Sequence, residues 1–307
     1  TETLENLNNL SITAESLVKD SFTKMDTQGQ YGAFISTQKE HALEKAARID
    51  AFRREGKKLG ALAGIPLAIK DNINVENVKT TCGSKILENF VSPYNATASQ
   101  KLLNQDAILI GKTNMDEFAM GSTSESSFFG ATQNPADTKL IPGGSSGGSA
   151  AVVSAGFVAG ALGSDTGGSI RQPAACCGVV GLKPTYGRVS RYGLVSYASS
   201  LDQIGPITNN VADSALLLNH ICGHDINDCT SSKQKVEDFT QNLNQDIQGK
   251  VIGIPKEYFG DGLDANVKTT LETSLQKLEK EGAILKEVSL PSLEPVSYTH
   301  LTLPTTD

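Results

Sequence analysis

The sequence predicts an α/β protein in which a mixed, mostly parallel sheet is covered by helices on both faces. Short apolar segments bounded by glycine and proline, such as residues 62–73 (LAGIPLAIKDNI), are typical of buried strands. They alternate with segments in which apolar residues recur at helical spacing. Over residues 251–290 a strand, a helix and a second strand follow one another, which is the pattern of a parallel crossover.

The first part of the chain is predicted to be helical before the strands begin. Residues 1–60 have helical character, and Thr37 with Glu40 fits a capping box at the start of one of these helices. The elements expected after them are a strand ending at Lys70, a helix over residues 98–104 and a strand over residues 107–110.

The second half of the chain continues this alternation. The apolar run from Ala150 to Ala161 is long enough for a buried helix. The elements expected after it are a helix over 211–222, a loose connection over 231–248, a strand over 251–255, a helix capped by Asp264 and stopped by Gly282, and a strand over 283–290.

The domain organisation follows from where these patterns stop. Residues 1–294 are interpreted as one domain that includes the helical part over residues 1–60. Residues 295–307 (PVSYTHLTLPTTD) have no periodicity, cap or domain ending. We therefore expect a chain that is truncated at its C-terminus and carries a tail that is non-native or disordered.

Composition and charge exclude several classes of protein. The net charge of −7 provides no basic surface for a phosphate backbone, so any RNA should be bound by a partner. No apolar run reaches the length of a membrane span, and the start has no signal-peptide layout. We expect no membrane association and a location in the cytoplasm or in an organellar matrix or stroma.

The cysteines indicate neither a disulfide framework nor a metal site. Their number, five, is odd, and their spacing fits no disulfide pattern, which agrees with a reducing compartment. His220, Cys222, His224 and Cys229 lie close in sequence, but their spacing matches no zinc pattern, so we expect no metal.

Two glycine-serine clusters are the main functional signal. They are residues 143–149 (GGSSGGS) and 165–169 (DTGGS), separated by the apolar run described above. Glycine lets backbone approach a ligand closely, so that amide N–H groups converge on one point. A flexible linker is the alternative, but a solvated linker would not carry the apolar run. A phosphate-binding loop is a second alternative, but no Lys-Ser or Lys-Thr pair follows the glycines.

Lys70 is the second functional signal. A lysine after an apolar strand is most often a surface residue that keeps its charge in water. Here the lysine precedes Asp71 and Asn72 at the end of the strand, so its side chain could also enter a cleft. The residues leave both interpretations open.

Three segments together resemble the amidase signature family. They are the GIPLAIKDN segment around Lys70, the GGSSGG run with Ser145 and the DTGGSIR run with Ser169, in the family's order and at similar separations. The likeness extends from the first helix to about Glu294. By this resemblance we expect the amidase signature fold and an enzyme that hydrolyses amides.

The resemblance also implies roles for individual residues. It implies that Ser169 is the nucleophile, that Lys70 is the base, and that Ser145 passes the proton between them after a cis peptide bond to Gly144. Serine-lysine chemistry requires Lys70 to be neutral, which burial favours. The residues expected to supply oxyanion-hole amides are Thr166, Gly167 and Gly168, together with Ser169 itself.

The sequence predicts less about the roles of other residues near the clusters. Met120, Gly121 and Ser122 could border the substrate or pack as an ordinary loop, and the sequence favours neither. Asp165 and Arg171 flank the nucleophile, and we expect them to pair with each other or hold the loop rather than take part in the chemistry.

Four segments carry a finer likeness within the family, namely residues 67–73 (LAIKDNI), 115–137, 181–206 and 253–259 (GIPKEYF). They are most similar to the A subunits of glutamyl-tRNA(Gln) amidotransferases. The likeness implies that glutamine is the substrate, that subunits B and C are partners, and that Glu-tRNA(Gln) is bound through a partner. It implies no cofactor in this chain, with ATP and magnesium used by the partner. Part of the glutamine pocket would lie in sequence that this chain lacks. A stand-alone amidase and an inactive scaffold are the alternatives.

Overall fold

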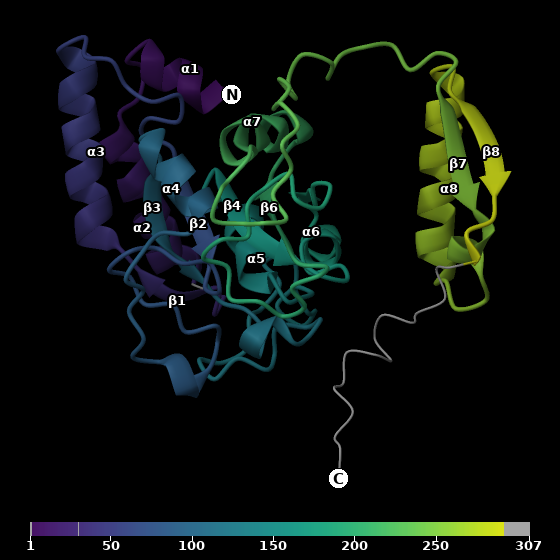
Figure 1. Cartoon of the computed structure of the whole chain (residues 1–307), viewed down its shortest axis with the longest axis horizontal. Helices are drawn as coiled ribbons and strands as arrows, with labels where there is room; N and C mark the ends of the chain where they lie inside the picture. The colour runs from purple at the N-terminus through teal and green to yellow at the C-terminus, as the bar shows by residue number, and fades with distance from the viewer. Residues whose placement is uncertain (1, 30, 292–307) are drawn as a thin grey trace. The chain divides into compact units, whose positions relative to one another are not determined.

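The computed structural model describes residues 2–29 and 31–291, which divide into two compact units on either side of the Thr240–Gln241 bond (Figure 1). The helices of the first unit are α1 (Glu2–Asn8), α2 (Ala14–Gln28), α3 (Lys39–Arg54), α4 (Thr97–Asn104), α5 (Gly147–Ser154), α6 (Arg171–Cys176) and α7 (Val211–Ile221), with short 3₁₀ helices η1 (Lys85–Leu87) and η2 (Glu117–Ala119). Its strands are β1 (Phe34–Thr37), β2 (Pro66–Lys70), β3 (Ile108–Thr113), β4 (Gly160–Asp165), β5 (Val180–Gly181) and β6 (Gln203–Thr208).

The described strands of the first unit form one mixed sheet in the order β1-β3-β2-β4-β6-β5. A mixed sheet with helices was predicted and is confirmed. Parallel pairs are not the majority in this sheet, because β2 pairs in parallel with β3 and β4 whereas the β1–β3, β4–β6 and β5–β6 pairs are antiparallel.

Different helices cover the two faces of this sheet. A Cβ added at Gly160 of β4 would meet Leu217 of α7, whereas one added at Gly163 would meet Ser146, which directly precedes α5. Positions separated by an odd number along a strand point to opposite faces. Helix α7 therefore covers one face, and α5 begins on the other.

The N-terminal region differs from its prediction in two ways. The capping box at Thr37 and Glu40 is wrong, because α3 begins after Gln38, which makes no side-chain capping bond. A capping box is present at α2 instead, formed by Thr13 and Ser16. Residues 34–37 form the edge strand β1 and not a helix, since they pair with β3.

The apolar run between the glycine-serine clusters contains more than the predicted helix. Helix α5 ends at Ser154, and Gly156 has a φ of 69°. The amides of Gly156 and Phe157 donate to the carbonyls of Val153 and Val152, which closes the helix end. The chain then turns into β4, so the run supplies a buried helix and the first two residues of a central strand.

The parallel β2–β4 pair brings the two main signals of the sequence together. Lys70 is the last residue of β2, as predicted, and Asp165 is the last residue of β4. Because parallel strands end at the same edge of a sheet, Lys70 and the second glycine-serine cluster lie at one edge.

The second unit contains β7 (Val251–Pro255), the 3₁₀ helix η3 (Lys256–Phe259), α8 (Ala265–Lys280) and β8 (Ile284–Val288). Strands β7 and β8 are parallel, so the predicted crossover is confirmed. Asp264 caps α8 by accepting from the amides of Asn266 and Val267, as predicted. The single domain over residues 1–294 stays a prediction, and the tail over 295–307 lies outside the described residues.

Candidate active site

Lys70 is fully buried, and its ammonium nitrogen is surrounded by serine oxygens. Nζ lies 2.7 Å from Ser145 Oγ, 2.9 Å from Ser164 Oγ and 3.4 Å from the Ser164 carbonyl oxygen. Among the described residues, no carboxylate lies within ion-pair distance of this nitrogen. A buried lysine in such surroundings is poorly stabilised in its charged form.

This environment changes the proton affinity of Lys70. Burial lowers its pKa from the ordinary 10.5 to about 7, although the more distant carboxylates of Asp116, Asp165 and Asp202 oppose the shift. At neutral pH a large fraction of this lysine therefore carries a lone pair. That lone pair can accept a proton from the hydroxyl of Ser145.

The loop that carries Ser145 is tightly enclosed. Ser145 is fully buried, and its peptide bond to Gly144 is cis, as the resemblance implies. A side chain at Gly144 would overlap the carboxylate of Asp116, so glycine is required there. The Asp116 amide donates to the Ser145 carbonyl at 3.3 Å. These contacts fix the position of Ser145 beside Lys70.

Ser169 lies in the turn between β4 and α6, and Asp165 organises that turn. The Asp165 carboxylate accepts from the amides of Gly168 and Ile170 at 2.8 and 3.0 Å. Arg171 donates to the same carboxylate through Nε and Nη2, both at 3.0 Å, so the two side chains pair and hold the loop as expected. Burial raises the pKa of Asp165, but these hydrogen bonds outweigh it, so the pKa lies below its usual value.

The amides proposed for an oxyanion hole are not equivalent. The Gly168 N–H is directed at Asp165, so it cannot serve a ligand without losing that bond. Thr166 donates to Asp202 through its side-chain hydroxyl, and that bond does not involve its amide. The segment from Thr166 to Ser169 is partly to fully accessible, whereas Lys70 and Ser145 are enclosed.

The two glycine-serine clusters are joined directly. The Ser146 amide donates to the Ser169 carbonyl at 3.1 Å. Ser146 Oγ donates to the Ser164 carbonyl at 3.1 Å, and the Ser164 amide donates to Ser146 Oγ at 3.3 Å. The structure thus brings together the loop of Ser145, the turn of Ser169 and the end of the Lys70 strand.

Met120, Gly121 and Ser122 lie on an exposed loop that contacts the first glycine-serine cluster. Gln172 connects the two segments, because its Oε1 accepts from the Gly144 amide at 2.8 Å and its Nε2 donates to the Ser122 carbonyl at 3.1 Å. This contact places Ser122 near Ser145, and a role in substrate binding stays a prediction for all three residues.

Sequence reasoning did not identify Asn72, Asp116, Ser164 or Gln172 as parts of this site. Ser164 and Asn72 could have been recognised from the sequence, since each lies within two residues of a strand end. Asp116 and Gln172 act across long sequence separations, and their neighbours gave no local indication of these contacts.

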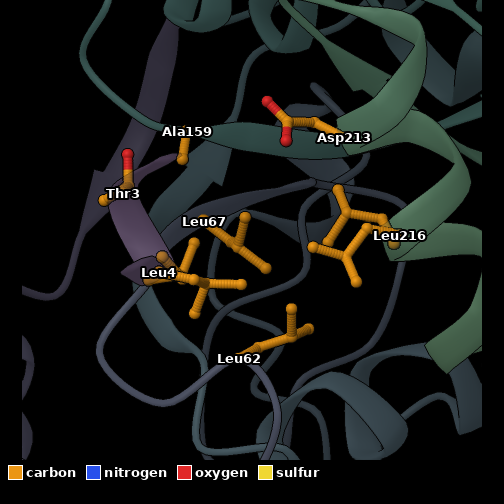
Figure 2. Close-up of a pocket in the computed structure, with 9 residues that line it drawn as sticks. Thr3, Leu4, Leu62, Leu67, Ala159, Asp213 and Leu216 are labelled. Carbon is orange, nitrogen blue, oxygen red and sulfur yellow. The ribbon is translucent and has the colours of Figure 1, made fainter. Parts of the chain in front are cut away.

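An apolar pocket lies elsewhere, between α1, β2 and α7 (Figure 2). Leu4, Leu62, Leu67 and Leu216 line it with carbon atoms, and Thr3 and Asp213 contribute oxygen atoms (Figure 2). Leu67 and Lys70 are three positions apart on β2 and so point to opposite faces. A cavity of about 40 Å³ has room for only a few waters, so it is not a substrate site.

The described residues contain no group of three or more His, Cys, Asp and Glu side chains arranged to hold a metal ion. The five cysteines are free thiols, of which Cys176 and Cys229 are exposed. None of the helices in residues 2–29 and 31–291 combines the length and apolar character that a bilayer span requires.

Known proteins resemble this chain in both sequence and structure. The A subunit of the glutamyl-tRNA(Gln) amidotransferase of Natranaerobius thermophilus is 57% identical over 282 residues, which cover 92% of this chain and 57% of the relative. The corresponding protein of Staphylococcus aureus is 51% identical over 296 residues, covering 95% and 61%. The crystal structure of the same A subunit from Thermotoga maritima matches with a TM-score of 0.82 and 46% identity, covering 91% and 59%.

A peptide amidase from Stenotrophomonas maltophilia matches with a TM-score of 0.85 and 34% identity, covering 94% of this chain and 61% of that one. The chain thus spans about three fifths of the length of these relatives. The amidase family model matches residues 16–303. On the serine-lysine geometry, the shared fold and these matches, the chain belongs to the amidase signature family.

Proposed function

We propose that this chain is the glutamine-hydrolysing part of a glutamyl-tRNA(Gln) amidotransferase. The observation that carries the proposal is the buried Lys70 nitrogen, 2.7 Å from Ser145 Oγ and without a neighbouring carboxylate in the described residues. The 57% identity to the A subunit of such an enzyme supports glutamine as the substrate.

The reaction begins with Ser169 as nucleophile. Ser169 Oγ attacks the side-chain amide carbon of glutamine while its proton moves to Ser145, whose own proton moves to Lys70. Amides of Thr166, Gly167 and Ser169 stabilise the oxyanion, each donor contributing roughly 3–4 kcal/mol, whereas Gly168 would contribute only by giving up its bond to Asp165. The tetrahedral intermediate collapses when the nitrogen takes a proton back along the same path and leaves as ammonia. Water then attacks the glutamyl ester on Ser169, releasing glutamate and restoring the hydroxyl.

The ammonia is proposed to serve a larger assembly. The relatives are named as the A subunit of a glutamyl-tRNA(Gln) amidotransferase, which supports a partner that amidates Glu-tRNA(Gln). We propose, from the family resemblance alone, that ATP and magnesium act in that partner. Subunits B and C are the proposed partners. The net charge of −7 supports binding of tRNA through a partner and not through this chain.

A stand-alone amidase is the second candidate. The structural match to a peptide amidase at 34% identity and a TM-score of 0.85 favours it. The serine-lysine chemistry is the same in both candidates, so the substrate distinguishes them.

The test is ammonia release by the folded chain, with glutamine, asparagine and a simple aryl amide offered separately. Release from glutamine that is lost in Ser169→Ala supports the proposal. Turnover of the aryl amide alone favours the stand-alone amidase. A folded chain inactive on every substrate contradicts glutamine hydrolysis by this chain and favours an inactive scaffold.

A further inference from the structure

Ser164 and Asn72 form a buried pair beside Lys70 to which no role in the reaction has been given above. They are 5% and 2% exposed. Asn72 Nδ2 donates to Ser164 Oγ at 3.0 Å, and Ser164 Oγ lies 2.9 Å from Lys70 Nζ. We propose that Ser164 and Asn72 are positioning residues that aim the lone pair of Lys70 at Ser145. This inference rests on the proposed serine-lysine chemistry.

The neutral and charged forms of lysine differ in hydrogen-bonding capacity. Neutral lysine has two N–H donors and one lone pair, whereas the ammonium has three donors. Ser164 offers Lys70 two acceptors, its hydroxyl oxygen at 2.9 Å and its carbonyl at 3.4 Å. When both N–H groups point at Ser164, the lone pair is left for the Ser145 hydroxyl at 2.7 Å.

Ser164 is itself held rigidly. Its main chain pairs with Ile204 of β6 and exchanges hydrogen bonds with Ser146 Oγ. Only the NH₂ end of the Asn72 amide has partners in the described part of the chain, so this side chain serves as a donor. An N–H directed at Ser164 Oγ holds that oxygen against Lys70.

The pair should affect the proton equilibrium of Lys70 as well as its orientation. In the ammonium form all three N–H groups have acceptors, so the Ser164 hydroxyl stabilises the charged state. Removing it should lower the pKa of Lys70, and a carboxylate at position 72 should raise it. The other titratable groups that act on Lys70 are Asp116, Asp165, Asp202 and Cys82, and the variants leave them unchanged.

The experiment measures labelling of Ser169 by a phosphonyl fluoride as a function of pH. In this reaction Ser169 Oγ forms a bond to phosphorus, fluoride leaves, and the serine proton passes through Ser145 to Lys70. The probe requires no glutamine pocket. The parent should be labelled at Ser169, and its rate should rise through a midpoint near pH 7, the pKa of Lys70.

Two variants should move that midpoint in opposite directions. Ser164→Ala should slow labelling roughly tenfold and lower the midpoint by about one pH unit. That is the shift expected when a charged group loses one hydrogen bond. Asn72→Asp should raise the midpoint. The control Ser214→Ala removes another buried hydroxyl of the first unit, one bonded to Thr208 and not to Lys70, and should leave the midpoint unchanged.

The outcomes separate this inference from the proposed function. If the parent is not labelled at Ser169, or if Lys70→Met labels at the parent rate, the serine-lysine chemistry itself is wrong. If the parent behaves as expected but Ser164→Ala and Asn72→Asp keep its midpoint, the two residues are merely structural and the inference is overturned.

Discussion

Lys70 and Lys112 are two fully buried lysines on neighbouring strands, yet their surroundings differ in one decisive respect. Lys112 Nζ lies 3.1 Å from a carboxylate oxygen of Asp71, whereas Lys70 faces only hydroxyl and carbonyl oxygens in the described residues. A buried ammonium is tolerated when a carboxylate compensates it. Without one, burial favours the neutral amine, so we propose base chemistry for Lys70 and a structural role for Lys112.

The comparison predicts that the activity depends on Lys70 and not on Lys112. Lys70→Met should slow phosphonyl fluoride labelling of Ser169 by roughly 10²–10⁴-fold, because it removes the base and leaves no unpaired charge. The measurement is the labelling rate alongside the circular dichroism spectrum. A folded Lys70→Met chain that labels at the parent rate would eliminate Lys70 as the base.

The stability of the fold should depend on Lys112 more than on Lys70. Lys112→Met should lower the free energy of unfolding by about 3–5 kcal/mol, because it leaves the Asp71 carboxylate buried and unpaired. Urea unfolding measures this difference. The matched control is Lys112→Met with Asp71→Asn, which removes both charges and should recover part of the loss. Equal losses in Lys70→Met and Lys112→Met would show that the two lysines do not differ as claimed.

The pH dependence of stability gives a third comparison. The pKa of Lys70 is about 7 in the folded chain and 10.5 as an ordinary lysine, so between these values the unfolded chain binds more protons. The contribution of Lys70 to the free energy of unfolding should therefore rise with pH across this window, by on the order of 1 kcal/mol per unit. Urea unfolding of the parent and Lys70→Met at pH 7 and pH 9 measures it. An unchanged difference between the two proteins would contradict the lowered pKa.

A smaller loss of stability is expected when the hydroxyl that contacts Lys112 is removed. Thr80 Oγ1 accepts from Lys112 Nζ at 3.1 Å, as Ser164 Oγ does from Lys70. Thr80→Val should cost about 1 kcal/mol of stability and leave the labelling rate unchanged, because Asp71 still compensates the charge. A slower labelling rate with normal stability would mean that the Lys112 centre also supports the chemistry.

Much of the fold could be predicted because its signals are local. The strand ending at Lys70, the Asp264 cap of α8 and the β7–β8 crossover depend on patterns within a few residues of each element. Strand β1 was missed because its pairing partner, β3, is more than 70 residues away. The end of α5 was missed because Gly156 stops the helix inside an apolar run that has no other boundary.

Only part of the site could be predicted, because several of its contacts are not local in the sequence. Resemblance to a family identified Lys70, Ser145 and Ser169, and the structure places Lys70 and Ser145 in direct contact. The nucleophilic role of Ser169 stays a prediction. The Asp71–Lys112 pair and the contacts of Ser164 join residues that are far apart in the sequence, so no local pattern reveals them.

The most direct measurement is the titration of Lys70 itself. In the folded parent, labelled with ¹³C at lysine Cε, the Lys70 resonance can be assigned by its absence from Lys70→Met and followed from pH 5 to pH 11. Neutral-base chemistry predicts a transition near pH 7. A resonance that stays in its charged position up to pH 10 would contradict the account, because Lys70 would then have no lone pair with which to accept the serine proton.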